Sequence, residues 1–494
     1  MPPKFVRILI RLAAKSFELK LPTLKSWLLR NISVTFAAAL LLISFHAWAA
    51  GEISNVTARS SPDWLRSGTI YEIFPRDFSK AGNLNGVTAQ LDELHTLGVN
   101  ILWTMPIHPI GEKFRKGEFG SPYSIKDYYA VDPNYGTVND YKRLVLEAHR
   151  RGMKVIMDLV ANHTAWDSVM MNHPDFYKHD ARGKMIPPVP EWTDVAALNY
   201  DNPALRQYMI AMLKYWIQTC DVDGFRCDSA AMVPTDFWEQ IRAALVKVKP
   251  DIIMLAEASK PELLTNAFDI DYSWPLLSTM NKVLAHDASA ARVRHSWEIS
   301  RAQFPKNALH LRISDDHDEP RAVNRYGFDG ALAASALMFT LDGVPLIYNG
   351  MEVGDKAESA GGALFNQQSI SWHSKEHQEL RSTYHDLIEL RHQYAALCNP
   401  DVEWLHNSDE TNLVTFLRRD DKDELLVIIN FSKLPLKGSI DLKNADGFVP
   451  VKISGRQNSD DTPLPIVHLH GFEWRIYHRS SLLSPATSVA AGNN

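Results

Sequence analysis

The chain has 494 residues, of which 45% are hydrophobic and 22% charged, and its net charge is −6. This balance excludes a mainly disordered chain, a collagen-like chain and a small disulfide-stapled domain, and the length predicts two or three domains. Residues 1–30 carry seven basic side chains and one acid, which leaves about −12 for the rest. An acidic body argues against nucleic acid or an anionic membrane as the main ligand and favours a neutral one.

The N-terminal residues 1–49 have the order of a secretory signal. An uncharged apolar run, 32–45, follows the basic block and precedes Ala47-Trp48-Ala49, an A-x-A cleavage pattern. The run is shorter than the roughly 20 residues that a membrane-spanning helix needs. We therefore expect a periplasmic or secreted protein without stable membrane association after signal removal, and an uncleaved signal anchor is the alternative.

The cysteine content is low. Cys220, Cys227 and Cys398 are too few, and odd in number, for a disulfide framework. Buried core thiols are the expectation, and a Cys220–Cys227 bridge in an oxidising compartment is the alternative. A bacterial periplasm would suit both the signal and the low cysteine count.

Short apolar runs alternate with amphipathic helical stretches from residue 68 to about 395. This alternation is typical of parallel βα units, and eight runs predict an α/β fold, a (β/α)8 TIM barrel over 62–398 with a short insertion at about 164–198. The competing open, doubly wound sheet lacks its G-x-G-x-x-G signature after the first strand. The expected strands are 69–74, 100–105, 155–160, 224–227, 252–256, 268–272, 309–313 and 345–348.

The pattern changes after about residue 400, where strand-like runs are separated by polar turns. These runs predict a C-terminal antiparallel β domain over 402–480. We expect it to pack against the barrel rather than bind starch, because the sequence has no clear exposed tryptophan pair there. Residues 481–494 are small and polar and are expected to be disordered. The runs are 411–417, 425–431, 450–453 and 473–478.

Several expected barrel strands end in acids or histidines, on the face where barrel enzymes gather functional groups. Arg226 and Asp228 flank Cys227 and so share one face of a strand. A nearby guanidinium lowers the pKa of a carboxylate, which would keep Asp228 ionised as a nucleophile requires. Glu257 ends an apolar strand, where burial raises the pKa of a carboxyl, as a general acid requires. Two carboxyls in opposed environments match the nucleophile and acid of a glycosidase.

Each of these features has a plainer explanation when it is taken alone. An Arg-x-Asp on a strand more often forms a buried ion pair, and a strand-end glutamate is more often solvated. A single histidine such as His163 is usually structural, and a His317-Asp318 pair also occurs in metal sites. The order and spacing of these residues on successive strands therefore carry the argument.

The motifs appear in a fixed order along the chain. D-x-x-x-N-H spans 158–163, G-F-R-x-D spans 224–228, Glu257 follows, and His-Asp occupies 317–318; supporting segments are 71–78, 121–128 and 343–352. In this order the sequence resembles the α-amylase family of retaining glycoside hydrolases, glycoside hydrolase family 13. The resemblance covers about residues 68–395 and extends into the C-terminal domain.

The resemblance implies a role for each matching carboxyl. Asp228 would form a covalent glycosyl-enzyme, Glu257 would act as acid and then base, and Asp318 would stabilise the transition state. The retaining mechanism predicts about 5–5.5 Å between the Asp228 and Glu257 carboxyls. The scissile bond would be an α-glucosidic linkage, most often α-1,4, in a maltooligosaccharide or α-glucan.

The same resemblance implies substrate-binding residues around the cleaved sugar. Tyr123 would stack beneath it, and His163, Arg226 and His317 would hydrogen-bond it, with Arg321 a weaker candidate. No cofactor is required. The family often binds calcium through the asparagine that corresponds to Asn162, although the spacing of nearby acids here matches no calcium loop.

The sequence departs from the family pattern beside the site. Asp316 replaces an asparagine that usually precedes the His-Asp pair, and this extra acid could shift the pH optimum. Ala231 and Met232 stand where many α-amylases carry Lys-His, which weakens the case for a typical endo-acting enzyme. A glucosyl or maltosyl transferase with the same carboxylates is the main alternative. A non-catalytic barrel subunit is the other, although such members have lost catalytic acids that are present here.

Overall fold

The computed structural model describes residues 53–358, 360–372, 375–454 and 462–481. The expected signal at 1–49 and the expected disordered residues 482–494 lie outside these ranges. In the part of the chain that is described, no helix has both the length and the hydropathy of a membrane span. The barrel and the C-terminal sheets belong to one compact unit.

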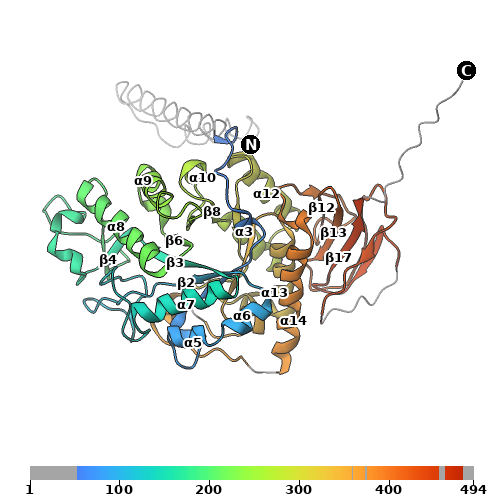
Figure 1. Ribbon diagram of the computed structural model, residues 1–494. Helices are drawn as coiled ribbons and strands as arrows, with labels where there is room; N and C mark the ends of the chain where they lie inside the picture. Colours follow the sequence, from blue (N-terminus) through green and yellow to red (C-terminus); the bar gives the residue numbers. More distant parts are fainter. Residues whose placement is uncertain (1–52, 359, 373–374, 455–461, 482–494) are drawn as a thin grey trace, which may run out of the picture. The chain divides into compact units, whose positions relative to one another are not determined.

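Eight parallel strands close into a barrel, which confirms the predicted (β/α)8 architecture (Figure 1). Each strand overlaps one of the eight expected runs. Nearly every strand residue is buried, because helices cover the outer face of the barrel; buried parallel strands therefore read as continuous apolar runs. The strands are β1 (Ile70–Ile73), β2 (Ile101–Thr104), β3 (Lys154–Val160), β6 (Gly224–Asp228), β7 (Ile253–Ala256), β8 (Ile270–Tyr272), β9 (His310–Arg312) and β10 (Val344–Tyr348).

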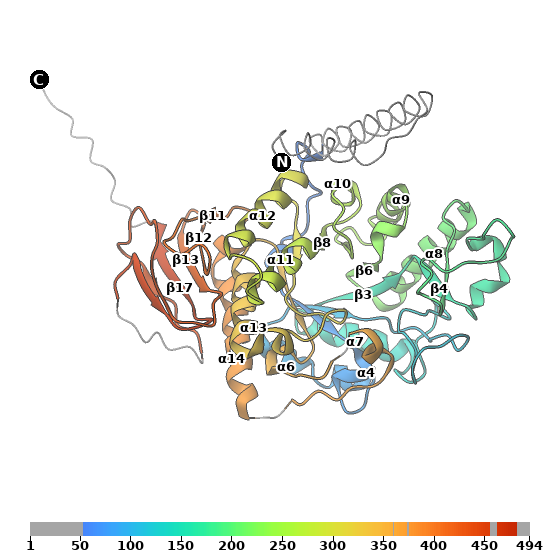
Figure 2. The same cartoon turned by 180° about the vertical axis from the view of Figure 1, so that it is seen from behind.

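Helices surround the barrel, as the view from behind also shows (Figure 2). Helix α7 begins with a capping box, in which Thr137 and Asp140 satisfy each other's backbone N–H groups. Helix α8 begins with an Asn202 cap before Pro203. The helices of ten residues or more are α7 (Val138–Arg150), α8 (Pro203–Cys220), α9 (Thr235–Leu245), α11 (Trp274–Leu284), α12 (Ala291–Gln303), α13 (Ala322–Thr340) and α14 (Lys375–Gln393); the shorter ones are α3 (Asp63–Arg66), α4 (Pro75–Phe78), α5 (Leu84–Thr88), α6 (Leu91–Leu97) and α10 (Leu263–Asn266).

The insertion after the third barrel strand starts and ends in a small antiparallel sheet. Strand β4 (His163–Ala165) pairs with β5 (Val195–Ala197), and His163 lies opposite Ala197. Two 3-10 turns, η1 (Val169–Asn172) and η2 (Pro174–Phe176), lie between them. The sequence did not predict this pair, because strands of three residues are too short to show an alternating pattern.

The C-terminal region forms two antiparallel sheets, as predicted for the β domain. Three short strands, β11, β14 and β16, were not predicted, and the expected strand 450–453 is reduced to Val449–Pro450. The five-stranded sheet runs β11 (Glu403–Trp404), β12 (Leu413–Arg419), β13 (Asp423–Asn430), β17 (Trp474–Ser480), β15 (Val449–Pro450); the second sheet pairs β14 (Leu436–Ser439) with β16 (Ile466–Leu469).

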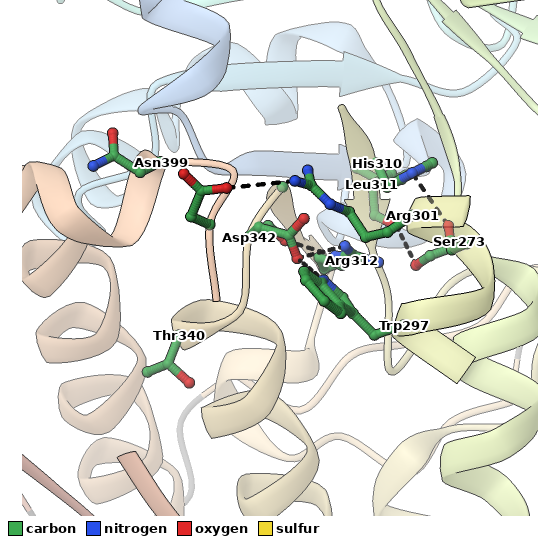
Figure 3. A network of polar contacts seen from close by, with 12 residues as sticks. Ser273, Trp297, Arg301, His310, Leu311, Arg312, Thr340, Asp342 and Asn399 are labelled. Carbon is green, nitrogen blue, oxygen red and sulfur yellow. Dashed lines mark hydrogen bonds and ion pairs between the residues drawn. The ribbon is translucent and has the colours of Figure 1, made fainter. Parts of the chain in front are cut away.

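A buried polar network joins this domain to the barrel. Arg418 of β12 is fully buried and donates to the carbonyls of Thr340, at 2.7 Å, and Leu397, at 3.3 Å. Nearby, Asp342 accepts hydrogen bonds from Trp297 of α12 and Arg312 of β9 (Figure 3). Because each of these donors meets an oxygen, the domain junction is polar without leaving these donors unsatisfied.

The three cysteines are free thiols. Cys220 and Cys227 are buried in the barrel core, as the sequence predicted, and no bridge joins them. Cys398 is partly exposed.

Candidate active site

A cavity of about 280 Å³ opens at the carboxyl ends of the barrel strands. Six of the eight residues expected to be catalytic or substrate-binding line it, and the exceptions are Arg226 and Arg321. A larger cavity of about 430 Å³ lies beside α11 and α12, but its lining has one carboxylate, Asp287, and so lacks an acid–nucleophile pair. The smaller cavity is lined by Lys116, Ser121, Tyr123, His163, Trp192, Asp194, Val195, Asp228, Ser229, Glu257, His317, Asp318, Gly361, Leu364 and Phe365.

Arg226 lies beneath the cavity and contacts both candidate catalytic carboxylates. Its Nη1 is 3.1 Å from Oδ1 of Asp228, and its Nη2 is 3.2 Å from Oε2 of Glu257. Nη1 also pairs with Asp158 at 3.2 Å. Because the guanidinium is rigid and fully buried, it fixes the two carboxylates next to each other. Arg226 therefore positions the catalytic carboxyls from below and does not line the cavity itself.

Asp228 ends β6, and its two oxygens have different surroundings. Arg226 holds Oδ1, whereas Oδ2 is buried without a hydrogen-bond partner among the described residues. Burial raises the pKa of Asp228 to about 6, although Arg226 opposes the shift. The expectation that the arginine would hold this pKa low is therefore corrected, because desolvation outweighs the ion pair. Asp228 is still mainly ionised at pH 7.

Glu257 directly follows β7, and its Oε2 accepts a hydrogen bond from the backbone N–H of Ser229 at 2.6 Å. Burial is the main cause that raises the pKa of Glu257 to about 7, against the effect of Arg226. Ser229 has φ +48°, an uncommon left-handed conformation for serine, immediately after Asp228. A carboxyl with this pKa can give up a proton and take it back near neutral pH.

Asp318 and His317 form the opposite side of the site. Nε2 of His317 lies 3.3 Å from Oδ2 of Asp318, and Nδ1 contacts the buried carboxylate of Glu72. Burial lowers the pKa of His317, but the carboxylates of Asp318 and Glu72 outweigh burial and raise it to about 10. His317 is therefore a cation at neutral pH, while the Asp318 side chain remains 45% exposed to the cavity.

Tyr123 and His163 complete the wall of the cavity. The Tyr123 ring stacks on His317 with centroids 5.4 Å apart, and its hydroxyl is 2.8 Å from Nε2 of that histidine. Burial lowers the pKa of His163 to about 4, so this ring is neutral and can both donate and accept a hydrogen bond. Trp192 lies edge-to-face with His163, 5.5 Å between centroids.

Arg321 is placed away from the cavity. It is fully buried, donates to the carbonyls of Asn349 and Asp355, and pairs with Asp315 at 3.5 Å. It therefore supports the loop after β10 rather than facing a sugar in the cavity.

The residues considered for calcium, Asn162 and the acids Asp167, Asp175 and Asp194, each have a partner within the protein. The Asn162 amide nitrogen lies 3.7 Å from the sulfur of Met232. Among the described residues, no group of three or more His, Cys, Asp or Glu side chains is arranged to hold a metal ion. Calcium binding through Asn162 stays a prediction, since calcium also takes amide and carbonyl oxygens. The nearby acids have other partners: Asp167 with Lys126, Asp175 with Asn202, and Asp194 with Lys116.

Sequence reasoning did not single out Glu72 or Lys116 as part of the site, and it considered Asp194 only as a possible calcium ligand. Glu72 is a fully buried acid within β1, and a charged residue inside an apolar strand was the available signal. Lys116 and Asp194 form a 2.7 Å ion pair at the cavity wall, from loops that are far apart in sequence. Only the fold brings that pair together.

The comparisons with known proteins agree with this geometry. A model of the α-amylase catalytic domain matches residues 62–184 and 191–389. The chain is 30% identical to the maltogenic α-amylase AmyB of Thermotoga neapolitana, covering 84% of this chain and 99% of that one, with a TM-score of 0.75.

Two further relatives are longer than the matched region. α-Amylase MalA of Haloarcula japonica is 28% identical over 77% of this chain and 58% of its own length. A cyclomaltodextrinase of Geobacillus thermopakistaniensis is 27% identical over 77% of this chain and 71% of its own.

A closed (β/α)8 barrel with two carboxyls fixed by one arginine at its carboxyl end defines a glycoside hydrolase of the α-amylase type. The chain belongs to the α-amylase family, glycoside hydrolase family 13.

Proposed function

We propose that this protein is a retaining hydrolase that cleaves α-glucosidic bonds, chiefly α-1,4, in maltooligosaccharides and related α-glucans. The observation that carries the proposal is the asymmetric support of Asp228. Arg226 holds one oxygen of this carboxylate, and the other is buried without a partner among the described residues, in a cavity that also contains Glu257 and Asp318.

In the first step, Oδ2 of Asp228 attacks the anomeric carbon, and the bond from that carbon to the leaving oxygen breaks. Glu257 donates its proton to the leaving oxygen, so the leaving sugar departs as a neutral alcohol. The product of this step is a glycosyl ester on Asp228, with Glu257 now ionised.

In the second step, Glu257 takes a proton from water, and the water oxygen attacks the same anomeric carbon. The ester bond to Asp228 breaks, and both carboxyls return to their starting charge. Asp318 and the His317 cation face the sugar from the other side, where they can bind its hydroxyls as positive charge develops on the ring. The proposal keeps the expected separation of about 5–5.5 Å between the two carboxyls.

The relatives' names guide the choice of substrates. Maltoheptaose and a cyclomaltodextrin are the two to compare, because relatives are named as α-amylases, maltogenic amylases and cyclomaltodextrinases. Only shorter sugars would support hydrolysis, whereas products longer than maltoheptaose would assign the chain to the transferase alternative. We also propose export, which the basic, apolar and A-x-A order of residues 1–49 supports.

The decisive test replaces Asp228 with asparagine, which keeps the size of the side chain but removes the nucleophile. We expect turnover of maltoheptaose to fall by at least about 10³-fold with an unchanged melting temperature. Asp287→Asn, in the larger cavity, is the matched control and should keep wild-type turnover. Substantial residual hydrolysis by purified Asp228→Asn, free of contaminating enzyme, would overturn the assignment.

A further inference from the structure

An aromatic pair, the exposed Phe114 and the partly buried Trp166, lies next to the catalytic cavity but does not line it. Phe114 precedes Lys116, a cavity residue, by two positions. Trp166 follows β4, and its Nε1 donates at 3.0 Å to the carbonyl of Thr193, which stands between two cavity residues in the chain. The two rings meet edge-to-face with centroids 6.1 Å apart. Because consecutive Cα atoms are about 3.8 Å apart, Phe114 is within roughly two residue lengths of the cavity wall.

Phe114 is an unusual residue for its position. Its side chain is 61% exposed, and its backbone has φ +63°, in the left-handed region that bulky side chains rarely adopt. Asparagine or glycine would fit this backbone with less strain. An exposed aromatic ring on a strained backbone gains little from folding, so its presence points to a role outside the fold.

The loop that carries Phe114 is held by polar contacts that do not involve the ring. The backbone N–H of Glu112 donates to Asp167 at 3.0 Å, and Nε of Arg115 donates to the carbonyl of Gly111 at 2.9 Å. Lys116 pairs with Asp194 at 2.7 Å. These polar contacts therefore fix the loop, and the Phe114 ring does not contribute to them.

Two contacts shape the environment of the ring. Trp166 stands nearly perpendicular to it, at 87°, and the ammonium group of Lys113 lies 5.5 Å from its centroid. A pyranose ring offers an apolar C–H face and a rim of hydroxyls. Two perpendicular aromatic rings can cover that face and one edge, and Lys113 can donate to the hydroxyls.

We propose that Phe114 and Trp166 form an accessory subsite for a glucose unit of an α-glucan chain, beyond the units held in the catalytic cavity. This inference rests on the proposed function for its substrate class. It makes the enzyme sensitive to chain length, because only a substrate long enough to leave the cavity reaches the pair. Its first consequence is a lower KM for long maltooligosaccharides than for short ones.

The test is Phe114→Asn, which removes the ring and suits the left-handed backbone. We expect kcat/KM for maltoheptaose to fall about tenfold, the effect of uncovering one stacked sugar ring, and kcat/KM for maltotriose to change less than about twofold. Phe114→Tyr keeps the ring and should restore the preference. Leu434→Asn, an exposed apolar residue of the C-terminal domain, is the matched control and should leave both values unchanged.

Two further readouts separate a subsite from other roles. The melting temperature of Phe114→Asn should equal or exceed that of the wild type; a clear fall would show that the ring supports the fold and would overturn the inference. The mass in solution should also be unchanged, since a shift would make the pair a contact between copies of the chain and would equally overturn it.

A binding measurement keeps this inference distinct from the proposed function. Maltoheptaose is titrated into the Asp228→Asn variant with and without Phe114→Asn, and the heat of binding is measured. About tenfold weaker binding in the double variant supports the subsite even if the wild type hydrolyses nothing. Equal binding, or no binding to either variant, overturns it even if hydrolysis is confirmed.

Discussion

The pH dependence of the first chemical step tests the assigned roles of the two carboxyls. Asp228 must be ionised to attack, and burial raises its pKa to about 6. Glu257 must be protonated to donate, and burial raises its pKa to about 7. Activity should therefore fall below pH 6 as Asp228 gains a proton, and above pH 7 as Glu257 loses one. Asp228 and Glu257 both contact Arg226 and so influence each other's ionisation. The two apparent pKa values of the activity profile therefore describe the pair of carboxyls rather than either residue alone.

The magnitude follows from these two values. With limbs at about 6 and 7, the fraction of enzyme in the active protonation state peaks near pH 6.5, and at pH 5 and pH 8 it is about sevenfold lower. The assay is kcat/KM for maltotriose from pH 4 to 9 at constant ionic strength. Enzyme stability is checked at each pH so that unfolding does not mimic a limb.

A substrate that needs no proton isolates the role of Glu257. Fluoride leaves a sugar without protonation, so kcat/KM for α-maltosyl fluoride should keep the acidic limb and lose the alkaline one. Glu257→Gln should keep kcat/KM for the fluoride, which reports only the first step, while losing most of its kcat/KM for maltotriose; its kcat for the fluoride should fall, because the second step still needs Glu257 as a base. An alkaline limb of the same size with the fluoride would refute the assignment of Glu257 as the acid.

Four other changes have definite expected results. Asp316→Asn should shift neither pH limb, because burial, with the neighbouring Asp318, raises the pKa of Asp316 well above its usual range and so opposes its ionisation; a shift of either limb would contradict this. Glu72→Gln should lower the pKa of His317 by roughly one to three units, measured by NMR of labelled histidine, since it removes the buried carboxylate on Nδ1. Arg418→Met should lower the free energy of unfolding by about 2–5 kcal/mol, measured with urea, because several buried carbonyls lose their donor while kcat is kept. Removal of divalent cations with EDTA should leave the melting temperature unchanged, because the described residues contain no group of three or more His, Cys, Asp or Glu side chains arranged to hold a metal ion. A lower melting temperature would show that a bound ion stabilises the native state.

The barrel could be predicted from the sequence because its strands are buried on both faces and separated by helices. All eight runs therefore stood out as apolar segments, and β6 kept Arg226 and Asp228 on one face as the two-residue period requires. The short strands β4, β5, β11, β14 and β16 could not be predicted in the same way. Barrel strands of similar length were found through the strand–helix alternation, but these strands lie outside it; with two to four residues they have no measurable period of their own, and tertiary pairing decides them.

The site could be predicted in its residue types but not in its electrostatics. The sequence placed Arg226 beside Asp228, yet it could not show that burial outweighs the ion pair and raises the pKa of the carboxyl. Nor could it show that Arg321 lies outside the cavity, because its position depends on Asn349 and Asp355, which are distant in sequence. Side-chain depth is a property of the closed barrel, and pKa values follow depth.

The charge balance of the cavity explains why one buried arginine serves both catalytic carboxyls. Asp158, Asp228 and Glu257 all contact Arg226, so three acids share one guanidinium. Three ionised carboxylates around one cation would leave a buried excess of negative charge, which the low dielectric makes costly. The excess is relieved when one acid keeps its proton. Glu257 has the higher pKa of the catalytic two, and it is also the one that chemistry needs protonated first. The arrangement that relieves this buried charge therefore also sets the protonation state from which the first step begins.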